Sequence, residues 1–156
     1  MKIMKKLTLV VMAAALIMLC ACGKEKNTEN KDVALEALAG KLLESGAFAE
    51  ELNRVDDGIA DKLYGITNAK TAYLYVGSGA VADELALFEF ESKEDAEAAV
   101  EQAQARVTAQ SESFADYIPE EVKKLDSAIV KTYGRYLVVC VSGGTEAGEI
   151  ISEYFK

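Results

Sequence analysis

The sequence predicts an α+β domain with a four-stranded antiparallel sheet. Two pairs of short β-favouring runs, 71–76 with 84–90 and 128–133 with 136–142, are each followed by a helical pattern. A long apolar stripe with helical spacing separates the two pairs. Because the strands come in pairs instead of alternating singly with helices, we expect an antiparallel sheet built from two ββα units, packed by a long helix and a C-terminal helix.

The N-terminal 21 residues have the layout of a secretory signal peptide. Lys2, Lys5 and Lys6 precede an apolar run over residues 7–19. This run of about 13 residues is shorter than the roughly 20 that a permanent membrane-spanning helix needs. We therefore expect residues 1–21 to be removed.

Cys22 is the expected first residue of the mature chain and the site of lipidation. Leu19 stands three positions before it and the small Ala21 stands directly before it, which suits cleavage by a lipoprotein peptidase. Cys20 competes for this role, but it directly follows the bulky Leu19. The pattern predicts a palmitate-type lipid anchor that holds the protein at the extracytoplasmic face of the cell membrane. The alternative is an ordinary signal peptide and a soluble secreted protein.

The rest of the chain divides into a tether and one domain. Residues 22–31 contain the lipidated cysteine and a polar stretch without large apolar side chains, which predicts a flexible spacer. Residues 32–156 are long enough for a single domain with its own core. Loss of the signal peptide, which contains three lysines and no acid, shifts the net charge from −9 to about −12. Such a charge disfavours nucleic acid as a partner.

Two helices are predicted before the first strand. The first spans residues 32–45, with Asp32 as a cap and Gly46 as a stop. The second spans residues 49–63, although Gly58 interrupts it. Apolar residues recur at helical spacing in this second segment, at Leu52, Val55, Ile59 and Leu63.

The central segment predicts two strands and the long helix. Residues 84–90 are apolar on both faces of a strand. Ser92 and Asp95 resemble a capping box, which predicts a helix start there. The helix continues for about 24 residues to Tyr117 along one apolar stripe, which consists of Ala96, Val100, Ala103, Val107 and Phe114.

The C-terminal part predicts a short helix, a hairpin and a last helix. Pro119 suits the first position of a helix that runs to Asp126. Gly134-Arg135 suits the turn between the last two strands, and Thr145 caps the final helix. We expect the long and the terminal helices to pack on one face of the sheet and the N-terminal helices to shield part of the other.

With these elements placed, residues 73–155 resemble an uncharacterised domain family of small lipoproteins, found mainly in Gram-positive bacteria and known only as a domain of unknown function. The resemblance implies a single-domain lipoprotein, and it implies no catalytic or ligand-binding residue. It rests on the run Asp83–Phe88 and then on Arg106, Gln110, Ser113-Phe114, Tyr117, Pro119-Glu120 and the hairpin at Gly134.

Composition excludes most catalytic templates. The chain has no histidine and no tryptophan, which rules out Ser-His-Asp and Cys-His catalysis and every His-containing zinc site. Asp83-Glu84 and Glu120-Glu121 are carboxylate pairs, but an acidic chain produces such pairs by chance. The acids around Asp56 lack the ligand spacing of a calcium loop. We expect no enzyme activity, no metal and no cofactor, and we expect Cys140 to be a buried structural residue.

The most suggestive polar feature is a line on the long helix. Arg106, Gln110, Ser113 and Tyr117 follow spacings of four, three and four, so they lie along one side of it. Interpreted functionally, they form the edge of a ligand or partner groove, where Arg106 binds an anion and Tyr117 stacks. Interpreted structurally, Arg106 pairs with an acid such as Glu120, while Ser113 and Tyr117 bond to backbone. The structural interpretation is favoured.

Two classes of function stay open at this stage. The leading hypothesis is a non-enzymatic binding or assembly module of the cell envelope, which meets an envelope protein partner through a sheet face or edge. Exposed tyrosines on an open face would serve as contacts; the candidates are Tyr73, Tyr75, Tyr133 and Tyr136. The alternative is a small-ligand-binding lipoprotein associated with a transporter.

Overall fold

A computed structural model describes residues 32–156. The predicted signal peptide, the predicted lipidation site Cys22 and the predicted tether lie outside the described residues. The central feature is one antiparallel sheet of five strands in the order β1-β2-β3-β5-β4. The strands are β1 (Asn53–Arg54), β2 (Thr71–Val76), β3 (Glu84–Glu89), β4 (Ile129–Tyr133) and β5 (Tyr136–Val141). The helices are α2 (Leu35–Glu44), α3 (Asp57–Tyr64), α4 (Lys93–Ala98), α5 (Val100–Tyr117), α6 (Pro119–Asp126) and α7 (Glu146–Tyr154).

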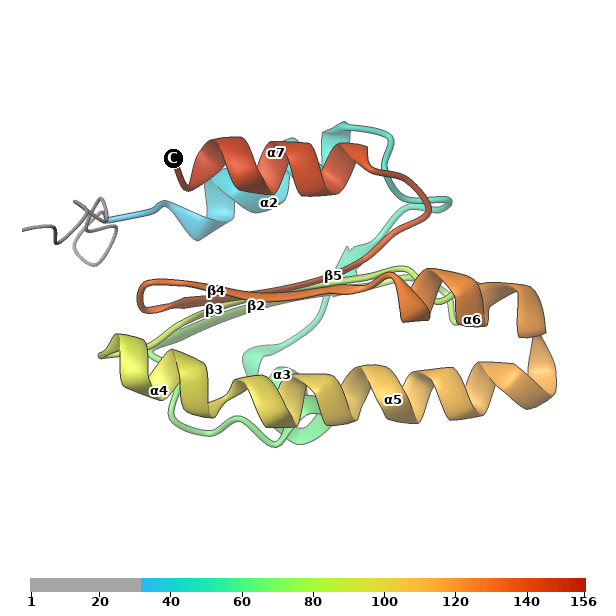
Figure 1. Cartoon of the computed structure of the whole chain (residues 1–156), viewed down its shortest axis with the longest axis horizontal. Coiled ribbons are helices and arrows are strands. Elements are labelled where there is room, and N and C mark those ends of the chain that lie inside the picture. Colours follow the sequence, from blue (N-terminus) through green and yellow to red (C-terminus); the bar gives the residue numbers. More distant parts are fainter. Residues whose placement is uncertain (1–31) are drawn as a thin grey trace, which may run out of the picture.

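The helices cover both faces of the sheet, which makes three layers. Figure 1 shows α2 and α7 together on one face and α3, α4 and α5 on the other. The expectation that the long and the terminal helices share a face was wrong. Alternate residues of β3 explain the arrangement, because Leu85 and Leu87 pack in the cluster with α2 and α7. Ala86 and Phe88 pack in the cluster with α3, α4 and α5.

The fifth strand, β1, lies where a helix was predicted. Asn53 and Arg54 pair antiparallel with the end of β2, so the predicted helix over 49–63 is correct only in its second half. Leu52 belongs to the core under α2 and α7, whereas Val55 packs against the core under α3. The chain therefore crosses the edge of the sheet at β1. A strand of two residues is too short to show the alternation of apolar and polar residues that identifies a strand. The apolar residues at helical spacing in 49–63 therefore predicted a helix over the whole segment.

Most other predicted elements are confirmed with small changes of boundary. The Ser92 hydroxyl accepts the Asp95 backbone N–H at 3.1 Å, as the capping box predicted. The long helix is present as α4 and α5, with an irregular turn at Ala99. Pro119 opens α6. Asp32 was wrongly placed as a helix cap, because α2 starts at Leu35 and Asp32 instead pairs with Arg135.

The sheet has no open face in the described part of the chain. Tyr75 is 9% exposed and Tyr136 is 2% exposed, and both belong to the core under α2 and α7. Tyr73 and Tyr133 are half-buried against the same core. The four tyrosines therefore pack beneath helices and do not form the open contact face that the sequence suggested.

Candidate functional site

Two adjacent buried acids stand where β3 begins, Asp83 directly before the strand and Glu84 as its first residue. Asp83 is 3% exposed and Glu84 is 1% exposed. Glu84 stands on the same side of the strand as Ala86 and Phe88, so its side chain enters the layer of α3 and α5. An ionised side chain at such a position has to be paired, because the loss of its hydration is expensive.

Four hydrogen bonds saturate the Glu84 carboxylate. Its Oε2 accepts from Arg106 Nη2 at 2.7 Å and from Gln110 Nε2 at 3.1 Å. Its Oε1 accepts from the Tyr64 hydroxyl at 2.6 Å and from Arg106 Nε at 3.3 Å. We call Glu84, Tyr64, Arg106 and Gln110 the Glu84 network. It joins β3 to α3 and α5, and it leaves no carboxylate oxygen unpaired for acid-base work.

Electrostatics keep the donors of this network protonated. Burial, and next the negative charge of Glu84, raise the pKa of Tyr64 well above its usual value. Burial alone would lower the pKa of Arg106, but the hydrogen bond and the charge of Glu84 outweigh it, and the pKa is raised. Tyr64 and Arg106 therefore remain donors at every physiological pH.

Asp83 belongs to a second network, which ties the loop before β1 and helix α6 to the sheet. Its Oδ1 lies 2.7 Å from Lys124 Nζ, and its Oδ2 accepts the backbone N–H of Ala49. Lys124 Nζ also lies 2.8 Å from Glu121 Oε2, which accepts the Ala82 N–H at 2.8 Å. Although burial raises the pKa of Glu121, these bonds outweigh it and lower the pKa. We call Asp83, Glu121 and Lys124 the Asp83 network, in which both acids are structural ion-pair partners of the lysine.

The four residues of the predicted polar line surround one shallow hollow beside α5. We call it the α5 hollow; it has a volume of about 280 Å³ and its lining includes Arg106, Gln110, Ser113, Tyr117, Phe114 and Gly79. The Tyr117 side chain is 73% exposed at its rim. Ser113 and Tyr117 make no side-chain hydrogen bond to another residue within 32–156, in contrast to the backbone bonds that the structural interpretation expected.

Sequence reasoning found the line but named the wrong acid as the partner of Arg106. The partner is Glu84, not Glu120, which is exposed on α6. The place of Asp83-Glu84 at the start of an apolar run indicated that these acids enter the core, but not which cation pairs with them. Tyr64 and Lys124, which complete the two networks, gave no such signal, since nothing in the pattern of α3 or α6 fixes which layer they enter.

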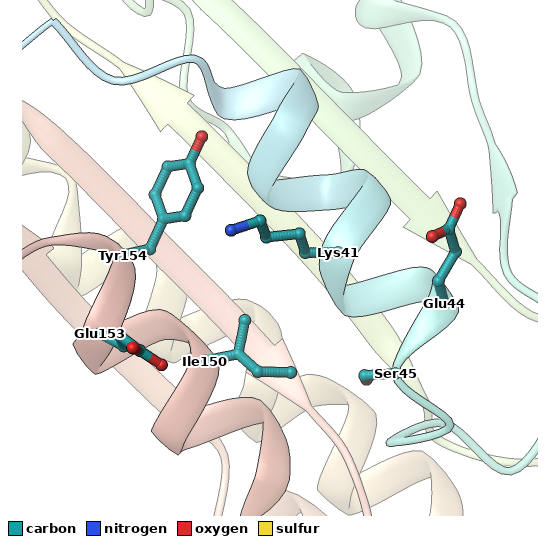
Figure 2. Close-up of a pocket in the computed structure, with 6 residues that line it drawn as sticks. All are labelled: Lys41, Glu44, Ser45, Ile150, Glu153 and Tyr154. Carbon is teal, nitrogen blue, oxygen red and sulfur yellow. The ribbon is translucent and has the colours of Figure 1, made fainter.

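A second hollow lies between the two helices of the other face. Figure 2 shows Lys41 and Glu44 of α2, with Ser45 directly after the helix, opposite Ile150, Glu153 and Tyr154 of α7. Its volume is about 600 Å³. The Tyr154 hydroxyl donates to the Ala34 carbonyl at 3.1 Å, and Lys41 Nζ lies 5.2 Å from the centre of the Tyr154 ring. These contacts hold the two helices together, so this hollow is part of the packing between α2 and α7.

Cys140 is fully buried in β5, and burial raises the pKa of its thiol to about 12. A thiol in this state is a poor nucleophile at neutral pH. In residues 32–156 no three or more His, Cys, Asp or Glu side chains gather in a way that would hold a metal ion. None of the helices in that range has the length and apolar character needed to cross a membrane.

Comparison with known proteins gives one match. The family model described as "Domain of unknown function (DUF4358)" matches residues 45–142, which is more than half of the chain and includes the whole sheet and helices α3 to α6. Neither the search of curated proteins nor that of solved structures gave a match. The matched range contains the Glu84 network, the Asp83 network and the α5 hollow, and we conclude that the chain belongs to the DUF4358 family.

Proposed function

We propose that this protein is a lipoprotein, held at the extracytoplasmic face of the cell membrane by acyl chains on Cys22, whose domain is a non-enzymatic binding or assembly module of the cell envelope. The sequence of residues 1–31 supports the anchor. Acyl chains contribute about 0.8 kcal/mol for each buried methylene, so two or more chains give durable attachment.

The position of the α5 hollow supports a role in binding. In Figure 1 the described chain begins at one end of the molecule, and the corner between α5 and α6 lies at the opposite end. A domain tethered through its N-terminus thus presents Tyr117 away from the membrane. An exposed aromatic side chain at this end is well placed to meet an envelope partner.

The single observation that carries the proposal is the contrast between the floor and the rim of the α5 hollow. The floor is fixed, because Arg106 and Gln110 are held by buried Glu84. The rim offers the Tyr117 ring and two hydroxyl groups without partners among the described residues. A rigid base with an accessible aromatic residue and adaptable polar groups is the arrangement of a recognition surface. Catalysis is less well supported, since the hydrogen bonds of the buried Glu84 carboxylate are saturated.

Metabolic labelling with an alkyne analogue of palmitate tests the anchor. We expect the wild-type protein and the matched control Cys20→Ser to incorporate the label and to stay with the membrane fraction. Cys22→Ser is expected to lose both properties. Equal labelling of the Cys22→Ser variant would contradict the proposed anchor.

Mild cross-linking in membranes followed by purification tests the binding surface. The variant Ser113→Arg/Tyr117→Ala changes only rim residues and is expected to fold, while Arg106 is left intact because Glu84 depends on it. Leu63→Ser on α3, where Leu63 is 39% exposed, is the matched control. We expect a specific envelope protein to be captured by the wild type and the control and to be lost from the rim variant. Capture by all three would place the partner surface elsewhere.

The second candidate function is a small-ligand-binding lipoprotein associated with a transporter. The α5 hollow favours it only in having convergent polar groups, because a volume of about 280 Å³ is at the lower limit for small-molecule sites. Saturable binding of a small solute that Ser113→Arg abolishes, without any captured protein, would favour this second function.

A further inference from the structure

The strand β4 forms one edge of the sheet and is the longer of its two edge strands. It has five residues, whereas β1 at the other edge has two. An edge strand presents unpaired backbone groups that another strand can pair with. Ile129, Lys131 and Tyr133 of this strand face the layer of α7, whereas the α5 hollow lies beside α5 on the other face of the sheet.

The register of the hairpin identifies which backbone groups point outward. Tyr133 pairs with Tyr136 across the two-residue turn at Gly134, whose φ of 56° is that of a tight hairpin turn. Hydrogen-bonded and non-hydrogen-bonded pairs alternate along an antiparallel ladder. The N–H and C=O groups of Val130 and Thr132 therefore face away from β5. They make no hydrogen bond to another described residue outside the ladder.

A groove of about 980 Å³ runs beside this edge, between β4 and α7. Ile129, Lys131 and Tyr133 of β4 form one side, and Ile151 and Gly148 of α7 form part of the other. A Cβ added at Gly148 would lie 3.5 Å from Ile129 Cδ1, so a side chain there would contact β4 across the groove. This edge therefore combines backbone N–H and C=O groups that an added strand can pair with and a groove that can receive the alternate side chains of that strand.

The charges beside β4 favour one kind of occupant. Lys131 stands at the centre of the strand, where its Nζ lies 4.9 Å from the centre of the Tyr133 ring, and neither it nor Lys156 has an ion-pair partner among residues 32–156. Glu149 and Glu153 of α7 also line the groove, so the positive charge that a partner would meet at the strand itself is that of Lys131. In a symmetric pairing of two β4 strands centred there, Lys131 would face its own copy, which is unfavourable. The chain's own tether also fits poorly, because residues 23–31 have no large apolar side chain for the space beside Ile151. An extended segment with an acid opposite Lys131 is complementary.

We propose that β4 binds an extended segment of another envelope protein by antiparallel strand addition, with an acidic residue opposite Lys131 and apolar residues directed into the groove beside α7. This inference rests on the proposed binding function and names the class of partner and the mode of recognition. It adds β4, on the other face of the sheet, as a second contact for the partner that meets the rim of the α5 hollow.

Synthetic peptides provide the probe. One is the heptapeptide Ala-Ile-Val-Glu-Thr-Tyr-Gly with soluble flanking residues, which copies residues 128–134 with glutamate in place of the central lysine. The matched control keeps the lysine. We expect saturable binding of the glutamate peptide to the mature full-length protein, with chemical-shift changes confined to β4 and α7, and about tenfold weaker binding of the lysine peptide. Equal binding of both peptides, or no binding, would overturn the proposal.

Two further measurements separate strand addition from simple charge attraction. N-methylation of the glutamate peptide at the residues flanking the glutamate removes the N–H donors and is expected to abolish binding. The variant Lys131→Glu is expected to reverse the preference toward the lysine peptide. Undiminished binding of the N-methylated peptide, or an unchanged preference, would overturn strand addition.

The same variant distinguishes this inference from the proposed function. If Lys131→Glu retains the captured envelope partner while the rim variant Ser113→Arg/Tyr117→Ala loses it, the binding function stands and strand addition at β4 is overturned as its means. If both variants lose the partner and Lys131→Glu reverses the peptide preference, both stand.

Discussion

The helices on the two faces of the sheet are held in place by different kinds of interaction. Beneath α2 and α7 the core is apolar, with Leu38, Leu42 and Ile151 fully buried. Beneath α3 and α5 an apolar core also contains Glu84, held by donors from both helices. The family match includes the helices of the second face, whereas α2 and α7 lie outside residues 45–142.

This difference separates two ways of fixing a helix on a sheet. Apolar contacts are non-directional, so α2 and α7 are held in proportion to the area that they bury. A buried carboxylate with directed donors tolerates only one placement of α5, because any shift leaves a charge unpaired. The face with the directed contacts is also the one that carries the α5 hollow, whose floor therefore has a fixed geometry.

The largest expected effect comes from unpairing the buried charge. Arg106→Met removes the cation and keeps a similar apolar stem, and we expect it to lower the free energy of unfolding by about 4 kcal/mol, since it leaves Glu84 ionised or forces it to take up a proton. Chemical denaturation measures this. A loss below about 1 kcal/mol would mean that the Glu84 network contributes little to the fold.

The matching substitution on the apolar face is Leu38→Ala. Leu38 is fully buried, and its truncation leaves a cavity under α2, so we expect a loss of about 3 kcal/mol in the same denaturation experiment. The rate of hydrogen exchange of the α5 backbone amides serves as the control, and we expect it to change less than the rate of the α2 amides. Equal effects on both helices would indicate that the two faces are not independent.

The Asp83 network predicts that the stability of the folded protein depends on pH. The pKa of Glu121 is lower in the folded protein than its usual value near 4.5, so its stabilisation is present above that pH and is lost as the pH falls through the folded pKa. We therefore expect Glu121→Gln to cost about 1 kcal/mol at pH 7 and progressively less toward pH 3. Thermal unfolding across this range measures the difference. A cost independent of pH would exclude an electrostatic role for Glu121.

The smallest expected effect concerns Cys140, whose strand contributes to both faces. With a pKa of about 12 and a fully buried side chain, its thiol is expected to resist iodoacetamide at pH 8 in the folded Cys22→Ser protein and to react only after unfolding. Mass spectrometry of the two states measures this. Rapid labelling of the folded protein would contradict the burial of β5.

Local chemistry made much of the fold predictable from the sequence. The capping box at Ser92, the proline that opens α6 and the turn at Gly134 each act within a few residues, and each predicted boundary is confirmed. The strand β1 and the assignment of helices to faces were not predictable in this way. Both depend on which layer a side chain such as Leu52 enters, which is decided by contacts distant in sequence.

The candidate site was predictable in part for the same reason. Helical spacing alone placed Arg106, Gln110, Ser113 and Tyr117 on one side of α5, and the structure brings all four to the α5 hollow. Glu84 lies 22 residues before Arg106 on another element, so no local rule identified it as the partner. Only the meeting of β3 with α5 makes the pairing visible.

A double-mutant cycle between Glu84 and Arg106 tests most directly whether directed charge pairing holds α5 on the sheet. The variants are Glu84→Met, Arg106→Met and the two combined, each measured by chemical denaturation. We expect the combined variant to be at least about 2 kcal/mol more stable than Arg106→Met alone, because no unpaired charge remains in the core. Losses that simply add in the combined variant would contradict the account, since they would mean that the two residues stabilise the fold independently.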